Sequence, residues 1–199
     1  YGVTWSDTAN VSEESLPNGM VDKPWGVMRG NNIYVSWQQP IPIQDGIIFA
    51  KSTDRGRTWN RTVADSTRAG FTCICLSPSG IIYLMNRYWG VDGVFCTRST
   101  DQGATWAPWV TVDPTCSYTE GYGDRAPLPS IAAPTDSNVV ITWVDDGLGD
   151  WDIVYCRSTD SGQTWSATAR LPDSSAGGQC KGWVTADYTG RLHFIWYHT

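Results

Sequence analysis

Several segments of the chain place aromatic rings next to charged side chains. These neighbours are Arg87 with Tyr88 and Trp89, Tyr122 with Arg125, and Asp150 with Trp151. Aromatic faces stack on the C–H face of a sugar, and carboxylate or guanidinium groups pair with its hydroxyls. We therefore predict a glycan or a protein surface as the ligand, bound by Tyr88, Trp89, Tyr122, Arg125 and Trp151. The alternative is that these rings pack between elements of the fold, as large aromatic side chains usually do.

The segment 145–152 reads D-D-G-L-G-D-W-D and is rich in the oxygen ligands that Ca²⁺ prefers. It lacks the spaced D-x-D-x-D-G pattern of a calcium loop, so a solvated turn is the alternative to a calcium site. The sequence contains no phosphate loop, no H-E-x-x-H and no nucleophile elbow. We predict no metal site and no cofactor, with Ca²⁺ as the one alternative.

Six cysteines, an even number in a chain with little charge, predict disulfides and an oxidising compartment. Buried free thiols are the alternative. A zinc site is excluded by spacing, because only Cys73 and Cys75 are close together and both histidines lie near the C-terminal end. Asn10-Val-Ser12 and Asn60-Arg-Thr62 match the N-glycosylation pattern. Together these features predict a glycoprotein that is secreted or lies at the cell surface.

The composition favours short strands and tight turns. Aromatic residues make up 13% of the 199 residues and charged residues only 17%, with 20 Gly. This balance is typical of β-rich proteins and argues against disorder. The net charge of −6 argues against a general nucleic-acid binder. No apolar run approaches the length of a membrane helix.

A repeated sequence pattern indicates the strands that position the candidate aromatic and charged residues. Ser52-Thr-Asp-Arg-Gly-Arg-Thr-Trp59 recurs at 99–106 and at 158–165, and Tyr1-Gly-Val-Thr-Trp5 matches the second half of the same pattern. Short β-rich runs precede and follow each copy, which gives four strands in roughly 50 residues. Repeated four-stranded units are the signature of propeller blades.

The pattern S-T-D-x-G-x-T-W has the chemistry of a turn. Its Asp accepts hydrogen bonds from backbone N–H groups a few residues on, and its Gly supplies a positive φ. Its Trp begins the next strand and buries a large ring between blades. We assign a structural role in this turn to Asp54, Gly56, Trp59, Asp101, Gly103, Trp106, Asp160, Gly162 and Trp165.

S-T-D-x-G-x-T-W resembles the Asp-box, or bacterial neuraminidase repeat, of sialidase-like β-propellers, and the resemblance covers essentially the whole chain. It implies an all-β propeller in which the Asp-box joins the third and fourth strands of a blade, opposite the active-site face. The resemblance divides one propeller region, 1–199, into about four blade-equivalents. Residues 1–12 are the last strand of a blade, 20–64, 70–113 and 127–172 are blades, and 180–199 is the first half of a further blade. It also implies that the chain is part of a larger propeller or array.

The resemblance further implies where sialidase chemistry would lie. Asp124-Arg-Ala-Pro127 approximates the family's R-I-P motif, with Ala in place of Ile, so Arg125 would hold a substrate carboxylate. Asp150, in the loop before the third strand of the same blade, would be the acid. No second or third arginine has a recognisable motif, and no Tyr–Glu nucleophile can be assigned in the sequence.

Three hypotheses for function follow. The first is a non-catalytic extracellular propeller module that binds a glycan or a protein. The second is part of a sialidase-type glycoside hydrolase. The third is a repeat unit of a filament or coat, in which neighbouring copies pair through open blade edges.

Overall fold

A computed structural model of the chain describes residues 8–12, 21–41, 44–67, 70–88, 93–116, 128–147, 149–172 and 177–198. The described residues contain strands and no helix, so the prediction of an all-β protein is confirmed. None of them forms a helix long and apolar enough to cross a membrane. The division of residues 1–199 into complete and partial blades at the stated boundaries stays a prediction.

The strands form three four-stranded antiparallel sheets and one two-stranded sheet, each in simple meander order. The first sheet comprises β1 (Asp22–Arg29), β2 (Asn32–Ile41), β3 (Gln44–Ser52) and β4 (Asn60–Asp65). The second comprises β5 (Gly70–Leu76), β6 (Ile82–Tyr88), β7 (Val94–Ser99) and β8 (Val110–Asp113). The third comprises β9 (Ser130–Ala132), β10 (Val139–Asp145), β11 (Asp152–Ser158) and β12 (Ala169–Arg170), and the fourth comprises β13 (Gln179–Ala186) and β14 (Leu192–His198). We call these sheets blades 1 to 4, since they have the form that the repeat predicts for propeller blades.

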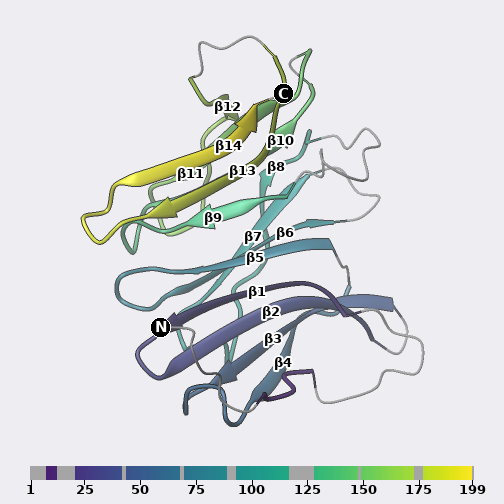
Figure 1. Ribbon diagram of the computed structural model, residues 1–199, viewed down its shortest axis with the longest axis vertical. Helices are drawn as coiled ribbons and strands as arrows, with labels where there is room; N and C mark the ends of the chain where they lie inside the picture. The colour runs from purple at the N-terminus through teal and green to yellow at the C-terminus, as the bar shows by residue number, and fades with distance from the viewer. Residues whose placement is uncertain are drawn as a thin grey trace.

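The first strands of the four blades are neighbours in space. From top to bottom in Figure 1 they follow the order β13, β9, β5, β1. Because each blade is a meander, its first-to-second and third-to-fourth connections lie on one side of the molecule, which we call the turn face. The second-to-third connections and the links between blades lie on the opposite side, which we call the loop face. The β1–β2, β5–β6 and β13–β14 turns project on the left of Figure 1.

Each complete Asp-box closes the same local network. In blade 1, Asp54 Oδ1 accepts from the Thr58 backbone N–H at 2.9 Å, and Asp54 Oδ2 accepts from the Thr58 hydroxyl at 2.6 Å. Ser52 Oγ donates to Asp54 and accepts from the Gly56 N–H at 2.8 Å. Asp101 and Asp160 repeat these bonds in blades 2 and 3. The glycine has positive φ, as the motif predicts, and so does the residue before it (Arg55, Gln102 and Ser161), which the motif did not indicate.

We expect these networks to make stability sensitive to acid. Hydrogen bonds from Thr105 and Ser99 lower the pKa of Asp101 from 3.8 to about 2, and equivalent bonds lower the pKa of Asp54 and Asp160. A lowered folded-state pKa stabilises the fold above the unfolded value, and this contribution is lost as pH falls through the folded value. The midpoint temperature of thermal unfolding should therefore decrease as the pH is lowered from 4 to 2. The triple variant Asp54→Asn, Asp101→Asn, Asp160→Asn should lose less over that interval, and an unchanged acid dependence would contradict the assignment.

The Asp-box also contacts the preceding blade. Lys51, just before the blade 1 box, donates to Gln102 of the blade 2 box at 2.5 Å. Arg98, at the equivalent position of blade 2, donates to the Ser161 carbonyl of the blade 3 box. A Cβ on Gly103 would lie 2.0 Å from Phe49 Cε1. The motif thus holds neighbouring blades together as well as forming its own turn.

The core lies between the blades. Trp143, Tyr83 and Met85 are fully buried in the cluster between blades 2 and 3, and Phe49 and Leu84 lie in the cluster between blades 1 and 2. All six cysteines are buried free thiols, so no disulfide is formed in the structure. Burial raises the pKa of the Cys73 and Cys116 thiols to about 12. The prediction of a disulfide framework is not supported, and the alternative of buried thiols describes the structure. Five of the cysteines lie on strands and Cys116 follows β8, and at these buried positions the small thiols pack as hydrophobic side chains.

Candidate functional site

The acidic segment that the sequence singled out lies on the loop face of blade 3. Asp145 ends β10 and is paired in register with Asp152, the first residue of β11. Asp145 accepts hydrogen bonds from the Gly147 N–H at 2.8 Å and the Trp143 indole at 3.4 Å. These bonds hold the segment as a turn at the end of the β10–β11 hairpin.

Asp152 is the buried acid of this turn. Its side chain is only 1% exposed, and Arg170 Nη2 on β12 lies 2.6 Å from its Oδ1. The contact is an ion pair without hydrogen-bond geometry, and neither Asp152 oxygen has a hydrogen-bond partner among the described residues. Burial raises the pKa of Asp152, Arg170 opposes the rise, and Asp150 and Asp145 add to it. The turn therefore holds a carboxyl group whose charge depends on one guanidinium.

Removing that guanidinium should destabilise the fold. We expect Arg170→Ala to cost about 2 kcal/mol near pH 7, because a buried carboxylate loses its ion partner while the half-exposed Arg170 is partly screened by water. An acid whose folded-state pKa is raised destabilises the fold fully above that pKa, and the effect disappears as pH falls to the unfolded-state pKa, so the cost should shrink as pH falls. Urea unfolding at neutral and acidic pH measures both values.

The matched control is the same substitution in an Asp152→Asn background. There the cost of Arg170→Ala should be small and independent of pH, since no buried charge remains to be compensated. Equal costs in both backgrounds would show that the ion pair does not hold this turn.

Trp151 and Asp150 lie at the rim of the loop face. Asp150 is exposed and its Oδ1 accepts from the Trp151 N–H at 2.7 Å. The Trp151 ring is partly buried and packs against Val144, Ile153 and Leu171. These two predicted residues are therefore brought together at an accessible edge.

Tyr88 lies elsewhere. It is 6% exposed, its hydroxyl donates to Asp65 Oδ2 at 2.6 Å, and its ring contacts Phe95 and Trp109. This places Tyr88 in the packing of blade 2 against the end of β4, as the packing alternative stated. Trp89, Tyr122 and Arg125 lie outside the described residues, so the roles of Arg125 in holding a substrate carboxylate and of Asp150 as the acid stay predictions.

Two further predictions concern modification and metal. Asn60 and Asn10 are both exposed, as a glycosylation acceptor must be. In the described part of the chain, no group of three or more His, Cys, Asp or Glu side chains is placed to hold a metal ion.

Sequence reasoning missed Arg170 and Gln179. Gln179 is fully buried, and its side-chain oxygen accepts from the Ile153 N–H at 3.0 Å. Its own N–H donates to the Trp151 carbonyl at 2.6 Å, so blade 4 fixes the backbone on both sides of Asp152. Their place in the repeat could have indicated them, because Arg170 lies on the last strand of blade 3 and Gln179 begins the first strand of blade 4.

No known protein family matches the sequence, and no curated protein matches it. Solved structures match the fold. The α-L-arabinofuranosidase of Fusarium graminearum is 14% identical, with a TM-score of 0.63 over 89% of this chain and 56% of that chain. The intramolecular trans-sialidase of Ruminococcus gnavus is 17% identical, with a TM-score of 0.54 over 83% of this chain and 36% of that chain. The NanB sialidase of Streptococcus pneumoniae is 16% identical, with a TM-score of 0.52 over 79% of this chain and 24% of that chain.

These similarities confirm the sialidase-like β-propeller fold that the Asp-box predicts. The chain spans between about a quarter and about half of the length of these three proteins. A fold of this kind supports several chemistries, so function must be argued from the site.

Proposed function

We propose that the chain is a glycan-binding, non-catalytic propeller module of a secreted or cell-surface protein. The observation that carries the proposal is the rim of blade 3. There the partly buried Trp151 follows the exposed Asp150, whose carboxylate accepts from the Trp151 backbone N–H, on a hairpin fixed by Asp145 and Gln179. An aromatic surface beside fixed polar groups is the usual way to bind a sugar.

Binding is favoured over hydrolysis by the position of Asp152. Its carboxyl group has a raised pKa, as an acid catalyst needs, but its side chain is 1% exposed and already ion-paired with Arg170. A sugar at the rim reaches Asp150 and Trp151 before it reaches Asp152. The exposed acceptors Asn10 and Asn60 support an extracellular location for the module.

A glycan array probed with the labelled 199-residue chain tests the proposal. We expect binding that Trp151→Ala weakens about tenfold, which is the effect of losing one aromatic platform. Trp109→Ala is the control, because Trp109 is also partly buried but packs against the cluster between blades 1 and 2. Binding that both variants reduce equally would reflect lost stability and would contradict a site at the rim.

The second candidate is a glycoside hydrolase, favoured by the raised pKa of Asp152 and by the fold shared with a sialidase and an arabinofuranosidase. Release of 4-methylumbelliferone from its sialoside, arabinofuranoside and xyloside tests this candidate. Turnover that is lost in Asp152→Asn would replace the binding proposal. Array binding without turnover would support it.

A further inference from the structure

A cavity of 580 Å³ opens on the turn face, away from the blade 3 rim. It is lined by residues 27–29, 74–78, 131–134 and 183–188, which are the later parts of β1, β5, β9 and β13 and the turns that follow them. Its volume lies in the range of small-molecule sites, roughly 300–1,000 Å³. No part of the proposed glycan site contributes to it.

The walls of this cavity offer both donors and acceptors. Each of the four lining strands is the end strand of its sheet, so one of its edges pairs with no strand in the described chain. Such an edge carries alternating backbone N–H and C=O groups. Ser130 shows how a hydroxyl fits this edge, because its Oγ accepts from the Val184 N–H and donates to the Val184 carbonyl, both at 3.1 Å. A ligand with many hydroxyls can repeat this arrangement.

A fully exposed tyrosine belongs to the lining of the cavity. Tyr188, at the tip of the β13–β14 hairpin, is 101% exposed and lines the cavity. A large ring without any protein cover offers a stacking surface for a sugar face. At the inner end, Trp183 lines the cavity, and its ring centroid lies 4.6 Å from that of Trp25.

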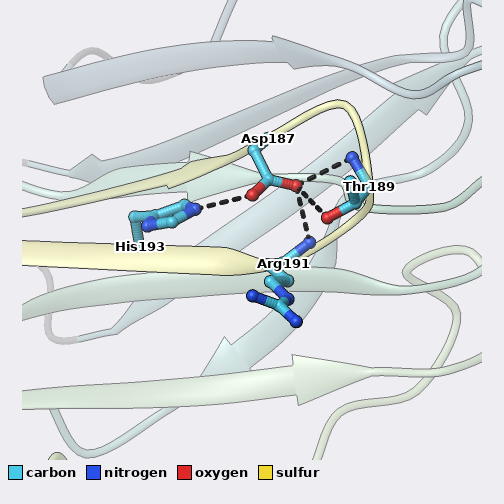
Figure 2. A network of polar contacts seen from close by, with 4 residues as sticks. All are labelled: Asp187, Thr189, Arg191 and His193. Atoms are coloured by element: carbon cyan, nitrogen blue, oxygen red, sulfur yellow. Dashed lines mark hydrogen bonds and ion pairs between the residues drawn. The ribbon is translucent and has the colours of Figure 1, made fainter.

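The turn that carries Tyr188 is fixed by one carboxylate (Figure 2). Asp187 Oδ1 accepts from the Thr189 N–H at 2.8 Å, the Thr189 hydroxyl at 2.6 Å and the Arg191 N–H at 3.1 Å. Asp187 Oδ2 contacts His193 Nε2 at 2.8 Å. The bond from the Thr189 hydroxyl and the contact with His193 lower the pKa of Asp187, which keeps the network charged and intact at neutral pH. A turn that is already ordered loses little entropy when a ligand binds to it.

The charged residues that line the cavity are balanced in sign. One basic residue, Arg29, and one acidic residue, Asp187, line the cavity, together with Ser77 and Thr185. Opposite charges of equal number give no net attraction for an anion or a cation.

We propose that this cavity binds a neutral saccharide, with Tyr188 stacking on a sugar ring and the strand edges pairing with its hydroxyls. This is a second site, on the face opposite the Trp151 rim, and it does not depend on the function proposed for that rim. Three features of the cavity together favour a neutral saccharide: strand edges that can pair with hydroxyls, an exposed ring on a fixed turn and balanced charge.

The test measures binding of cellotriose, lactose and N-acetyllactosamine to the 199-residue chain by saturation-transfer NMR and calorimetry. We expect at least one of them to bind, with Tyr188→Ala weakening it about tenfold and Tyr188→Phe leaving it within about twofold. Thr185→Trp, which fills the cavity from an exposed position on β13, should abolish binding. Circular dichroism of each variant checks that the fold is retained.

Trp151→Ala separates this proposal from the previous one. Saccharide binding that survives Trp151→Ala but is lost in Tyr188→Ala and Thr185→Trp supports the cavity. Binding that is lost in Trp151→Ala and unchanged in Tyr188→Ala overturns the cavity and leaves the rim proposal standing. Absence of binding by all three saccharides at about 10 mM, a concentration that detects the weakest specific complexes, also overturns it.

Discussion

Gly103→Ala is expected to destabilise the chain by about 3 kcal/mol, because two costs add at this position. The backbone φ of Gly103 is +86°, a conformation that costs an alanine roughly 1 kcal/mol. The new Cβ would also lie 2.0 Å from Cε1 and 2.5 Å from Cζ of Phe49, a buried ring of blade 1. Phe49 contacts Trp106 at 5.2 Å between centroids, so it cannot move without disturbing the packing between blades 1 and 2. Urea unfolding followed by tryptophan fluorescence measures the change.

Gly56→Ala is the matched control for this prediction. Gly56 occupies the same Asp-box position with a φ of +87°, but its nearest neighbour to an added Cβ, Ile33 Cδ1, is at 3.5 Å. This variant should therefore cost only the backbone contribution, about 1 kcal/mol. In a Phe49→Ala background the Gly103→Ala cost should fall toward the same value. Equal costs for Gly56→Ala and Gly103→Ala would contradict a tight contact between Gly103 and Phe49 across blades 1 and 2.

Trp143→Ala is expected to have the second large effect, a loss of about 4 kcal/mol, which is typical when a buried aromatic ring is truncated. Trp143 is 0% exposed in the core between blades 2 and 3, and its indole N–H reaches Asp145 at the base of the acidic turn. The substitution should leave a cavity and free Asp145. Trp143→Phe should cost less, since most of the ring volume is kept.

Trp196→Ala is the control for Trp143→Ala. Trp196 recurs at the corresponding second-strand position of blade 4 but is only partly buried, so its truncation should cost about 1 kcal/mol. Thermal and urea unfolding of the two variants give the comparison. Similar losses for both would mean that the core between blades 2 and 3 does not dominate stability.

The fold was largely predictable because its information is repeated. Three copies of S-T-D-x-G-x-T-W, with β-rich runs at the same offsets, specify the same four-stranded unit, and the structure contains those units. The state of the cysteines was not predictable in this way, because a count of cysteines does not show where the thiols lie. All six thiols lie buried and free.

The candidate site was predictable only in part. Asp150 and Trp151 could be placed on the second-to-third loop of blade 3 from the repeat alone, and the structure has Asp150 exposed and Trp151 partly buried there. Tyr88 was predicted on the same ground, an aromatic ring next to a charged residue, but it is buried against Asp65. The difference arises because the exposure of each ring depends on which side chains of neighbouring strands and blades pack against it. A local sequence pattern does not contain that information.

Local residue types were enough to specify the Asp-box turns, the meander of each blade and the acidic hairpin. These rest on hydrogen bonds between residues at most five positions apart or between adjacent strands, so local residue types suffice. Three features arise from packing in three dimensions: the contact of Gly103 with Phe49, the ion pair of Asp152 with Arg170 and the cavity beside Tyr188. The Gly103 contact and the cavity join different blades, and the ion pair crosses blade 3 from β11 to β12. Each depends on how side chains and blade faces meet in three dimensions, and that geometry is set by the packing of the whole set of sheets.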